Sequence, residues 1–118
     1  MDRILQATIN TLSGLRSALH SEAAFRQELV LLVLAVPAAF LVATDNWRRL
    51  FLVASILLVL VVELLNTAIE KLADRVTRDR DPAIGRVKDM GSAAVGLALV
   101  LAGLAWLLAV CERIASFL

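Results

Sequence analysis

The sequence predicts an all-α membrane protein, built from an N-terminal amphipathic surface helix and three transmembrane helices. The first reason is composition: 60% of the 118 residues are hydrophobic and the mean hydropathy is +0.82, which is too apolar for a soluble domain of this size. The second is the presence of three long segments that are almost free of charge. The chain length suits one domain, which we place at residues 1–118.

The three apolar segments have the lengths that membrane helices need. The runs with no charge or a single charge are Leu29–Thr44, Leu50–Ile69 and Met90–Cys111. The segment between the second and third runs is charged and contains a proline and a glycine, as expected for a turn between two helices. We therefore predict transmembrane helices at residues 29–46, 48–70 and 90–112, joined by a cytoplasmic connection at residues 71–87.

The N-terminal segment, residues 1–26, differs from these spans. Leu5, Ile9, Leu12, Leu15 and Leu19 recur at helical spacing, and polar residues fill much of the other side. This pattern predicts an amphipathic helix that lies on the membrane surface. An ordinary helix packed against the spans fits the same pattern equally well.

Lysine and arginine are unevenly distributed over the two sides of a three-span protein. Of the 12 such residues, nine fall in the N-terminal segment and the second connection, and three fall in the first connection and the C-terminal tail. By the positive-inside rule, the N-terminus is cytoplasmic and the C-terminus is outside. The net charge of +1 is spread without a basic block, so the composition does not indicate a nucleic-acid partner.

The second span carries several polar side chains near its cytoplasmic end, in the stretch "VVELLNTAIEK" at residues 61–71. On a helix, an arc of about 100° holds Glu63, Asn66, Thr67, Glu70 and Asp74. An acidic group at the centre of a span costs about 2.5–3.5 kcal/mol on insertion scales, so this polar stripe must face protein, water, a cation or a polar substrate. Hydrogen bonding between helices is one explanation. The two glutamates also suit Mg²⁺, which prefers oxygen ligands, and Glu63 suits a general base.

Two further motifs lie at the predicted cytoplasmic edge. They are "EAAFRQE" at residues 22–28 and "GRVKDMGSAA" at residues 85–94. Lys88 has the charge to hold a phosphate group, and a lysine that only extends to the membrane interface fits as well. The P-loop and protein-kinase motifs of soluble enzymes do not occur in the sequence.

Together, "VELLNTAIEKLADR" (62–75), "KDMGSAA" (88–94) and "EAAFRQE" (22–28) resemble the prokaryotic diacylglycerol kinase family, and its proteobacterial branch in particular. The E-x-x-N-[ST]-x-x-E core is the most specific of these signals. The resemblance implies a homotrimer in the bacterial inner membrane, with active sites formed between subunits. It also implies ATP-dependent phosphorylation of diacylglycerol to phosphatidic acid, with Mg²⁺ as the cofactor and diacylglycerol and ATP as the partners.

The resemblance implies roles for individual residues as well. Glu63 is the expected general base on the lipid hydroxyl, and Glu22 and Glu70 are the expected Mg²⁺ ligands. The expected ATP-binding residues are Arg3, Asn10, Glu22, Glu70, Asp79, Arg80, Asp81, Lys88 and Asp89. The expected substrate-binding residues are Ala24, Phe25, Arg26, Gln27, Glu28, Glu63, Asn66 and Ser92.

Three other functions fit parts of the same pattern. An undecaprenol kinase of the same family would differ in its lipid substrate. A small proton-coupled membrane transporter would use Glu63 but would leave Glu70, Lys88 and Asp89 without a role. A structural membrane subunit would tolerate replacement of Glu63 without loss of any chemistry.

Overall fold

Four helices make up the fold in a computed structural model that describes residues 2–118. In chain order they are α1 (Asp2–Ser21), α2 (Ala23–Val42), α3 (Asn46–Val76) and α4 (Pro82–Ala115). Residues 2–118 contain no strand, which confirms the all-α fold class. The helices α2, α3 and α4 are each long and apolar enough to cross a membrane, as expected for a membrane protein.

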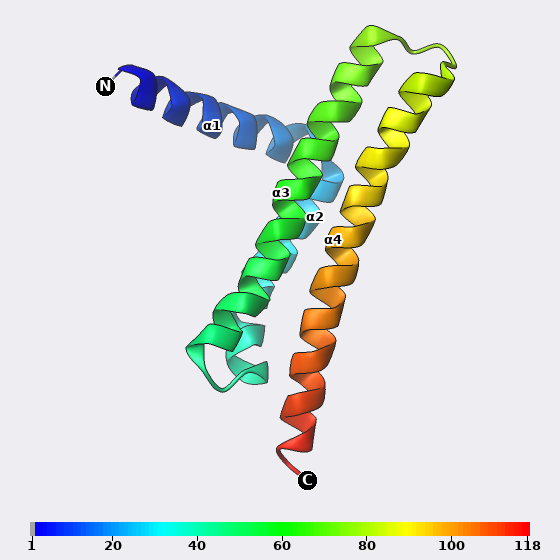
Figure 1. The fold of residues 1–118 in the computed structure, drawn as a ribbon. Coiled ribbons are helices and arrows are strands. Elements are labelled where there is room, and N and C mark those ends of the chain that lie inside the picture. The colour runs from blue at the N-terminus through cyan, green and yellow to red at the C-terminus, as the bar shows by residue number, and fades with distance from the viewer. Residues whose placement is uncertain (1) are drawn as a thin grey trace.

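The three long helices form an elongated bundle with α3 at its centre (Figure 1). The helices α3 and α4 run antiparallel, and α2 packs against α3. With 31 and 34 residues, α3 and α4 are about 46 and 51 Å long. Both exceed a hydrocarbon layer of about 30 Å, so they extend past the membrane. Figure 1 shows that the turn joining them, at residues 77–81, lies beyond the level of α1.

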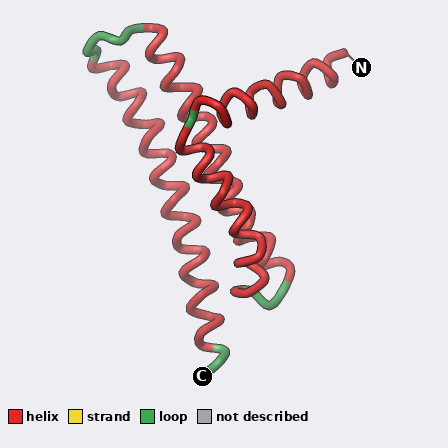
Figure 2. Tube along the Cα trace, turned by 180° about the vertical axis from the view of Figure 1, so that it is seen from behind, coloured by secondary structure: helices red, strands yellow, loops and turns green. Residues whose placement is uncertain are grey.

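The first helix leaves the bundle at a sharp corner, and both views show it projecting away from the other helices (Figures 1 and 2). Glu22, at the corner, has an extended backbone with φ −118° and ψ 110°. The Arg26 guanidinium closes the corner by donating hydrogen bonds to the carbonyls of Leu19 and His20. Ala18 is the buried residue of α1. The N-terminal helix is therefore present, and its position on a membrane surface stays a prediction.

Aspartates determine where α3 and α4 begin. The Asp45 carboxylate accepts a hydrogen bond from the backbone N–H of Arg48 at 2.9 Å. The Asp81 carboxylate accepts two backbone N–H groups of the first turn of α4 at 2.9 and 3.3 Å. Pro82 follows at a position where its missing N–H costs no helical hydrogen bond. Such N-caps satisfy donors that a helix start leaves free.

The contacts between the long helices depend on small residues. One buried cluster joins Ala35 of α2, Ile56 and Val59 of α3, and Ala98 and Ala102 of α4. Small side chains let membrane helices approach closely, which increases their van der Waals contact.

Much apolar surface of α4 remains uncovered in the single chain. Only 11% of the most apolar 18-residue window of α4 is buried. Leu97, Leu101 and Leu104 are among its exposed side chains. In a membrane this surface contacts lipid or another protein chain, and the expected homotrimer stays a prediction.

Candidate active site

Four glutamates gather where the α1–α2 corner meets α3. Glu63 is half-buried and lies within electrostatic reach of Glu22 at the corner and of Glu70 one heptad further along α3. Glu28 of α2 interacts with Glu63 in the same way. One Glu28 carboxylate oxygen is buried and has no hydrogen-bond partner among the described residues. Glu28 and Glu63 are therefore partly covered by protein, whereas Glu70 is exposed.

Asn66 links this carboxylate cluster to α4. It is 8% exposed, and its side-chain Nδ2 donates a hydrogen bond to Oε1 of Glu70 at 3.2 Å. Its Oδ1 lies against Gly91 of α4 and has no hydrogen-bond partner among residues 2–118. The carboxamide is thus held by Glu70 on one side and by the surface of α4 on the other.

Lys88 forms an ion pair with Asp74 at the edge of the bundle. Its Nζ atom lies 2.5 Å from Oδ1 of Asp74, and the two side chains are 39% and 35% exposed. A second lysine, Lys71 of α3, donates to the hydroxyl of Ser21 at 3.4 Å and so connects α3 to the corner. Lys71 therefore lies at the level of the α1–α2 corner, whereas Lys88 pairs with Asp74, which is closer to the turn at residues 77–81.

The carboxylates near Glu63 are the candidate ligands for the expected Mg²⁺ ion. Within residues 2–118, no group of three or more His, Cys, Asp or Glu side chains is arranged to hold a metal. Magnesium on a nucleotide usually keeps several waters and takes only one or two carboxylates besides the phosphates. Glu22 and Glu70 each lie within electrostatic reach of Glu63, and each offers carboxylate oxygens, the ligand type that Mg²⁺ prefers.

The other expected ATP-binding residues are spread along the chain. Arg3 is separated from Glu22 by nearly the whole of α1, about 28 Å along the helix. Asn10 lies midway, where it accepts a hydrogen bond from Gln6 and lines a cavity of about 400 Å³ between α1 and α3. The turn between α3 and α4 holds Asp79, Arg80 and the helix cap Asp81. Asp89 is exposed on α4. One chain alone therefore does not bring Arg3 to the carboxylates.

The expected substrate-binding residues have mixed environments. Phe25 is 5% exposed and packs with Ala18 and Leu60, so it stabilises the corner. The Arg26 side chain also supports the corner through its bonds to α1. The exposed members are Ala24, Gln27 and Ser92, and the half-buried or buried ones are Glu28, Glu63 and Asn66.

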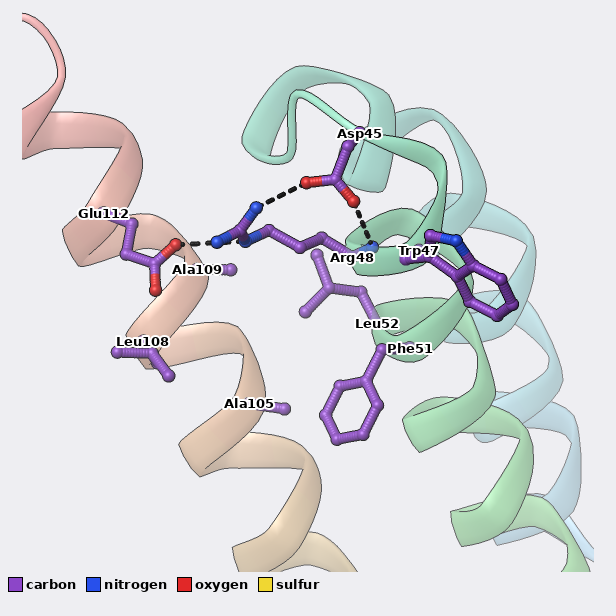
Figure 3. A pocket seen from close by; sticks show the side chains of 9 residues that line it. All are labelled: Asp45, Trp47, Arg48, Phe51, Leu52, Ala105, Leu108, Ala109 and Glu112. Atoms are coloured by element: carbon purple, nitrogen blue, oxygen red, sulfur yellow. Dashed lines mark hydrogen bonds and ion pairs between the residues drawn. The ribbon is translucent and has the colours of Figure 1, made fainter.

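A separate polar cluster lies at the opposite end of the bundle (Figure 3). The Arg48 guanidinium contacts Asp45 at 2.5 Å and Glu112 of α4 at 3.2 Å. It borders a cavity of about 400 Å³ whose other walls include Phe51 and Leu108. The cluster ties the start of α3 to the end of α4, far along both helices from Glu63.

Comparison with known proteins places the chain in a family. The model described as "Prokaryotic diacylglycerol kinase" matches residues 10–110. The chain belongs to this family. Diacylglycerol kinase from Escherichia coli (strain K12) is 45% identical over 104 residues, which cover 88% of this chain and 85% of that protein. Diacylglycerol kinase from Pseudomonas aeruginosa is 45% identical over 106 residues, covering 90% and 86%.

Diacylglycerol kinase from Haemophilus influenzae is 37% identical over 106 residues, covering 90% of each chain. The family resemblance carried by the three motifs is confirmed, and the chain is an enzyme of the kinase type.

Two contacts of the candidate site were not predicted from the sequence. They are the ion pair between Asp74 and Lys88 and the close approach of Asn66 to Gly91. Each joins α3 to α4 across the turn at residues 77–81, so helical periodicity gives no signal for it. The only sequence hint was the cluster of small residues that begins at Gly91.

Proposed function

We propose that this chain transfers the γ-phosphoryl group of ATP to the free hydroxyl of diacylglycerol and so forms phosphatidic acid. The match of residues 10–110 to the prokaryotic diacylglycerol kinase family carries the proposal. The names of the curated relatives support the choice of lipid. The gathering of Glu22, Glu63 and Glu70 supports a phosphoryl-transfer site at this level of the bundle.

In the proposed reaction, Glu63 accepts the proton of the lipid hydroxyl. The hydroxyl oxygen bonds to the γ-phosphorus while the bond to the β–γ bridging oxygen breaks, and ADP leaves. Glu70 follows Glu63 by seven residues and so lies about 10 Å nearer the 77–81 turn. This separation suits a lipid hydroxyl that arrives from the membrane and an ATP that arrives from water.

The remaining roles are assigned around these two glutamates. Glu22 and Glu70 would hold Mg²⁺, which would supply positive charge to the ATP phosphates. The proposed nucleotide contacts are Arg3, Asn10, Asp79, Arg80, Asp81, Lys88 and Asp89. The proposed lipid-positioning residues are Ala24, Phe25, Arg26, Gln27, Glu28, Asn66 and Ser92.

We propose that the enzyme is a homotrimer with active sites between subunits. The distance of about 28 Å along α1 between Arg3 and Glu22 supports this arrangement, because Arg3 can then serve the site of a neighbouring copy. The uncovered apolar surface of α4 is also consistent with further copies. Chemical cross-linking of the enzyme in detergent tests the trimer, and a product limited to monomers would contradict it.

We further propose a bacterial inner-membrane location with a cytoplasmic N-terminus and an outer C-terminus. The excess of lysine and arginine in the N-terminal segment and at residues 71–88 supports this orientation. In a Cys111→Ser background, Ser116→Cys should react with an impermeant maleimide added to spheroplasts. Thr77→Cys should react only after lysis. The reverse labelling would overturn the orientation.

One assay tests the function. The purified chain in detergent receives Mg-ATP and either a short-chain diacylglycerol or undecaprenol, and the phosphorylated lipid is measured. Diacylglycerol should be the better acceptor. A preference for undecaprenol would show that the enzyme is an undecaprenol kinase. Failure to phosphorylate either lipid would exclude both kinase functions and favour a transporter. A Glu63→Gln preparation run in parallel controls for contaminating kinases.

A further inference from the structure

We propose that Gly91 is a positioning residue for Glu70. Its lack of a side chain makes room for the carboxamide of Asn66, and this carboxamide holds the Glu70 carboxylate. The role of Gly91 rests on the proposed function, in which Glu70 binds the Mg²⁺ that accompanies ATP. The predicted consequence is that a methyl group at position 91 weakens metal–nucleotide binding without separating the helices.

The contact itself is very close. A Cβ atom added to Gly91 would collide with Oδ1 of Asn66, and it would lie 3.3 Å from Cγ and 4.0 Å from Cβ of the same side chain. These three nearest atoms all belong to Asn66. The space next to Gly91 is therefore filled by one carboxamide on α3.

The direction of the carboxamide follows from its chemistry. A carboxylate only accepts hydrogen bonds, so the NH₂ group of Asn66 must face Glu70, and its oxygen then faces Gly91. That oxygen is buried and has no hydrogen-bond partner among the described residues. Its position is set by packing against Gly91 and by the single bond from Nδ2 to Glu70.

A methyl group at position 91 would therefore move the carboxamide before it moves a helix. The carboxamide is the free end of a side chain that can rotate, whereas α3 and α4 are held together by the buried cluster of Ile56, Val59 and Ala98. Rotation of the carboxamide breaks its bond to Glu70. The substitution at position 91 therefore acts on Glu70, a proposed metal ligand, although Gly91 itself is not proposed to contact metal or nucleotide.

The other glycines of α4 provide matched controls. A Cβ atom added to Gly85 or Gly96 meets no atom within 4 Å in residues 2–118. Gly85 lies nearer the cytoplasmic turn and Gly96 lies deeper in the same helix, so the two variants bracket position 91. Replacing glycine by alanine within a helix is itself stabilising, and this effect is common to all three variants.

The experiment measures binding of a non-hydrolysable ATP analogue to the full chain in detergent as a function of Mn²⁺ or Mg²⁺ concentration. Gly91→Ala should weaken the metal-dependent binding about tenfold, the scale expected when a hydrogen bond to a charged group is lost. Gly85→Ala and Gly96→Ala should bind as the wild type does. In the kinase assay, Gly91→Ala should raise the KM for Mg-ATP more than it lowers kcat.

A double-mutant cycle separates this mechanism from a general packing defect. Asn66→Ala removes the carboxamide, so adding Gly91→Ala in that background should cause no further loss of binding. A second loss of about tenfold, as additivity would give, would overturn the proposal. If Gly91→Ala alone fails to fold, the double variant should fold because the collision is gone, and an unfolded double variant would also overturn the proposal.

Glu70→Gln is measured in parallel. If Glu70→Gln weakens metal-dependent binding and Gly91→Ala does not, the positioning role is wrong while the metal role of Glu70 stands. If Glu70→Gln leaves the binding unchanged, the metal role is wrong and the role of Gly91 falls with it.

Discussion

The Nζ atom of Lys88 on α4 lies 2.5 Å from Oδ1 of Asp74 on α3, so the lysine proposed to contact ATP already has an anionic partner. Both side chains are more than a third exposed, and such pairs contribute only about 0.2–1 kcal/mol to stability. A weak pair can release its lysine to a phosphate at little cost. The pair and the nucleotide would then compete for one ammonium group.

Two substitutions separate these roles of Lys88. Lys88→Met should weaken Mg-ATP binding, because a positive charge near the phosphates is lost, while Asp74→Asn should not, because it frees the lysine. The KM for ATP and the thermal unfolding midpoint in detergent are measured for both variants. An equal loss of ATP affinity in the two variants would show that Lys88 acts only through its ion pair.

Glu63→Gln tests the proposed general base. The amide cannot accept the hydroxyl proton, so turnover should fall by about 10²–10⁴-fold, the usual contribution of general acid–base catalysis. Binding of the ATP analogue should persist. Glu112→Gln, at the far end of the bundle, is the matched control and should retain turnover. Wild-type turnover in Glu63→Gln would contradict the base role and would favour a structural use of this glutamate.

Asp81 has both an observed and a proposed role, and two variants distinguish them. Asp81→Ala removes the N-cap of α4 and should cost about 0.5–2 kcal/mol of unfolding free energy. Asp81→Asn keeps a capping oxygen and should restore stability. If Asp81 also contacts ATP, the asparagine variant will be stable but will have a higher KM for ATP. A wild-type KM in Asp81→Asn would show that Asp81 only caps α4.

The stability contributed by the connection between α2 and α3 should depend on pH. The backbone N–H of Arg48, and then its guanidinium, bind the Asp45 carboxylate and lower its pKa below the ordinary value. A depressed carboxyl pKa stabilises the fold above the unfolded value near 3.9, and this stabilisation is lost as the pH falls through the lower folded value.

Asp45→Asn isolates this effect, because asparagine keeps the capping oxygen without the charge. At pH 7 the wild type should unfold at a higher temperature than the variant, and the gap should close as the pH is lowered below about 4. Thermal unfolding of both proteins in detergent between these pH values measures the gap. A gap that stays constant would mean that the charge of Asp45 has no part in capping α3.

Much of this protein could be predicted from its sequence because a helix has one geometry. Apolar runs of span length imply helices in a membrane, and all of α2, α3 and α4 carry such runs. The spacing of Asn66 and Glu70 places both side chains on one helix face, and the structure adds the hydrogen bond between them. Contacts within one helix need no knowledge of its neighbours.

Residue spacing does not predict the contacts between helices. Asn66 meets Gly91, Asp74 meets Lys88 and Arg48 meets Glu112, and each pair joins α3 to α4. These meetings depend on how α4 is rotated and shifted along α3. That register is set by many weak contacts of small residues along the whole interface, such as Ala98 and Ala102, rather than by any motif.

By itself, the sequence determined that the protein has a short polar stripe at the end of a membrane helix, with Glu63 deeper than Glu70. Only the tertiary structure decided what each member of the stripe touches. Glu63 lies within electrostatic reach of Glu22 at the α1–α2 corner, while Asn66 and Asp74 contact α4. The physical reason is that periodicity defines a face of one helix, whereas the partners of that face depend on the packing of the others.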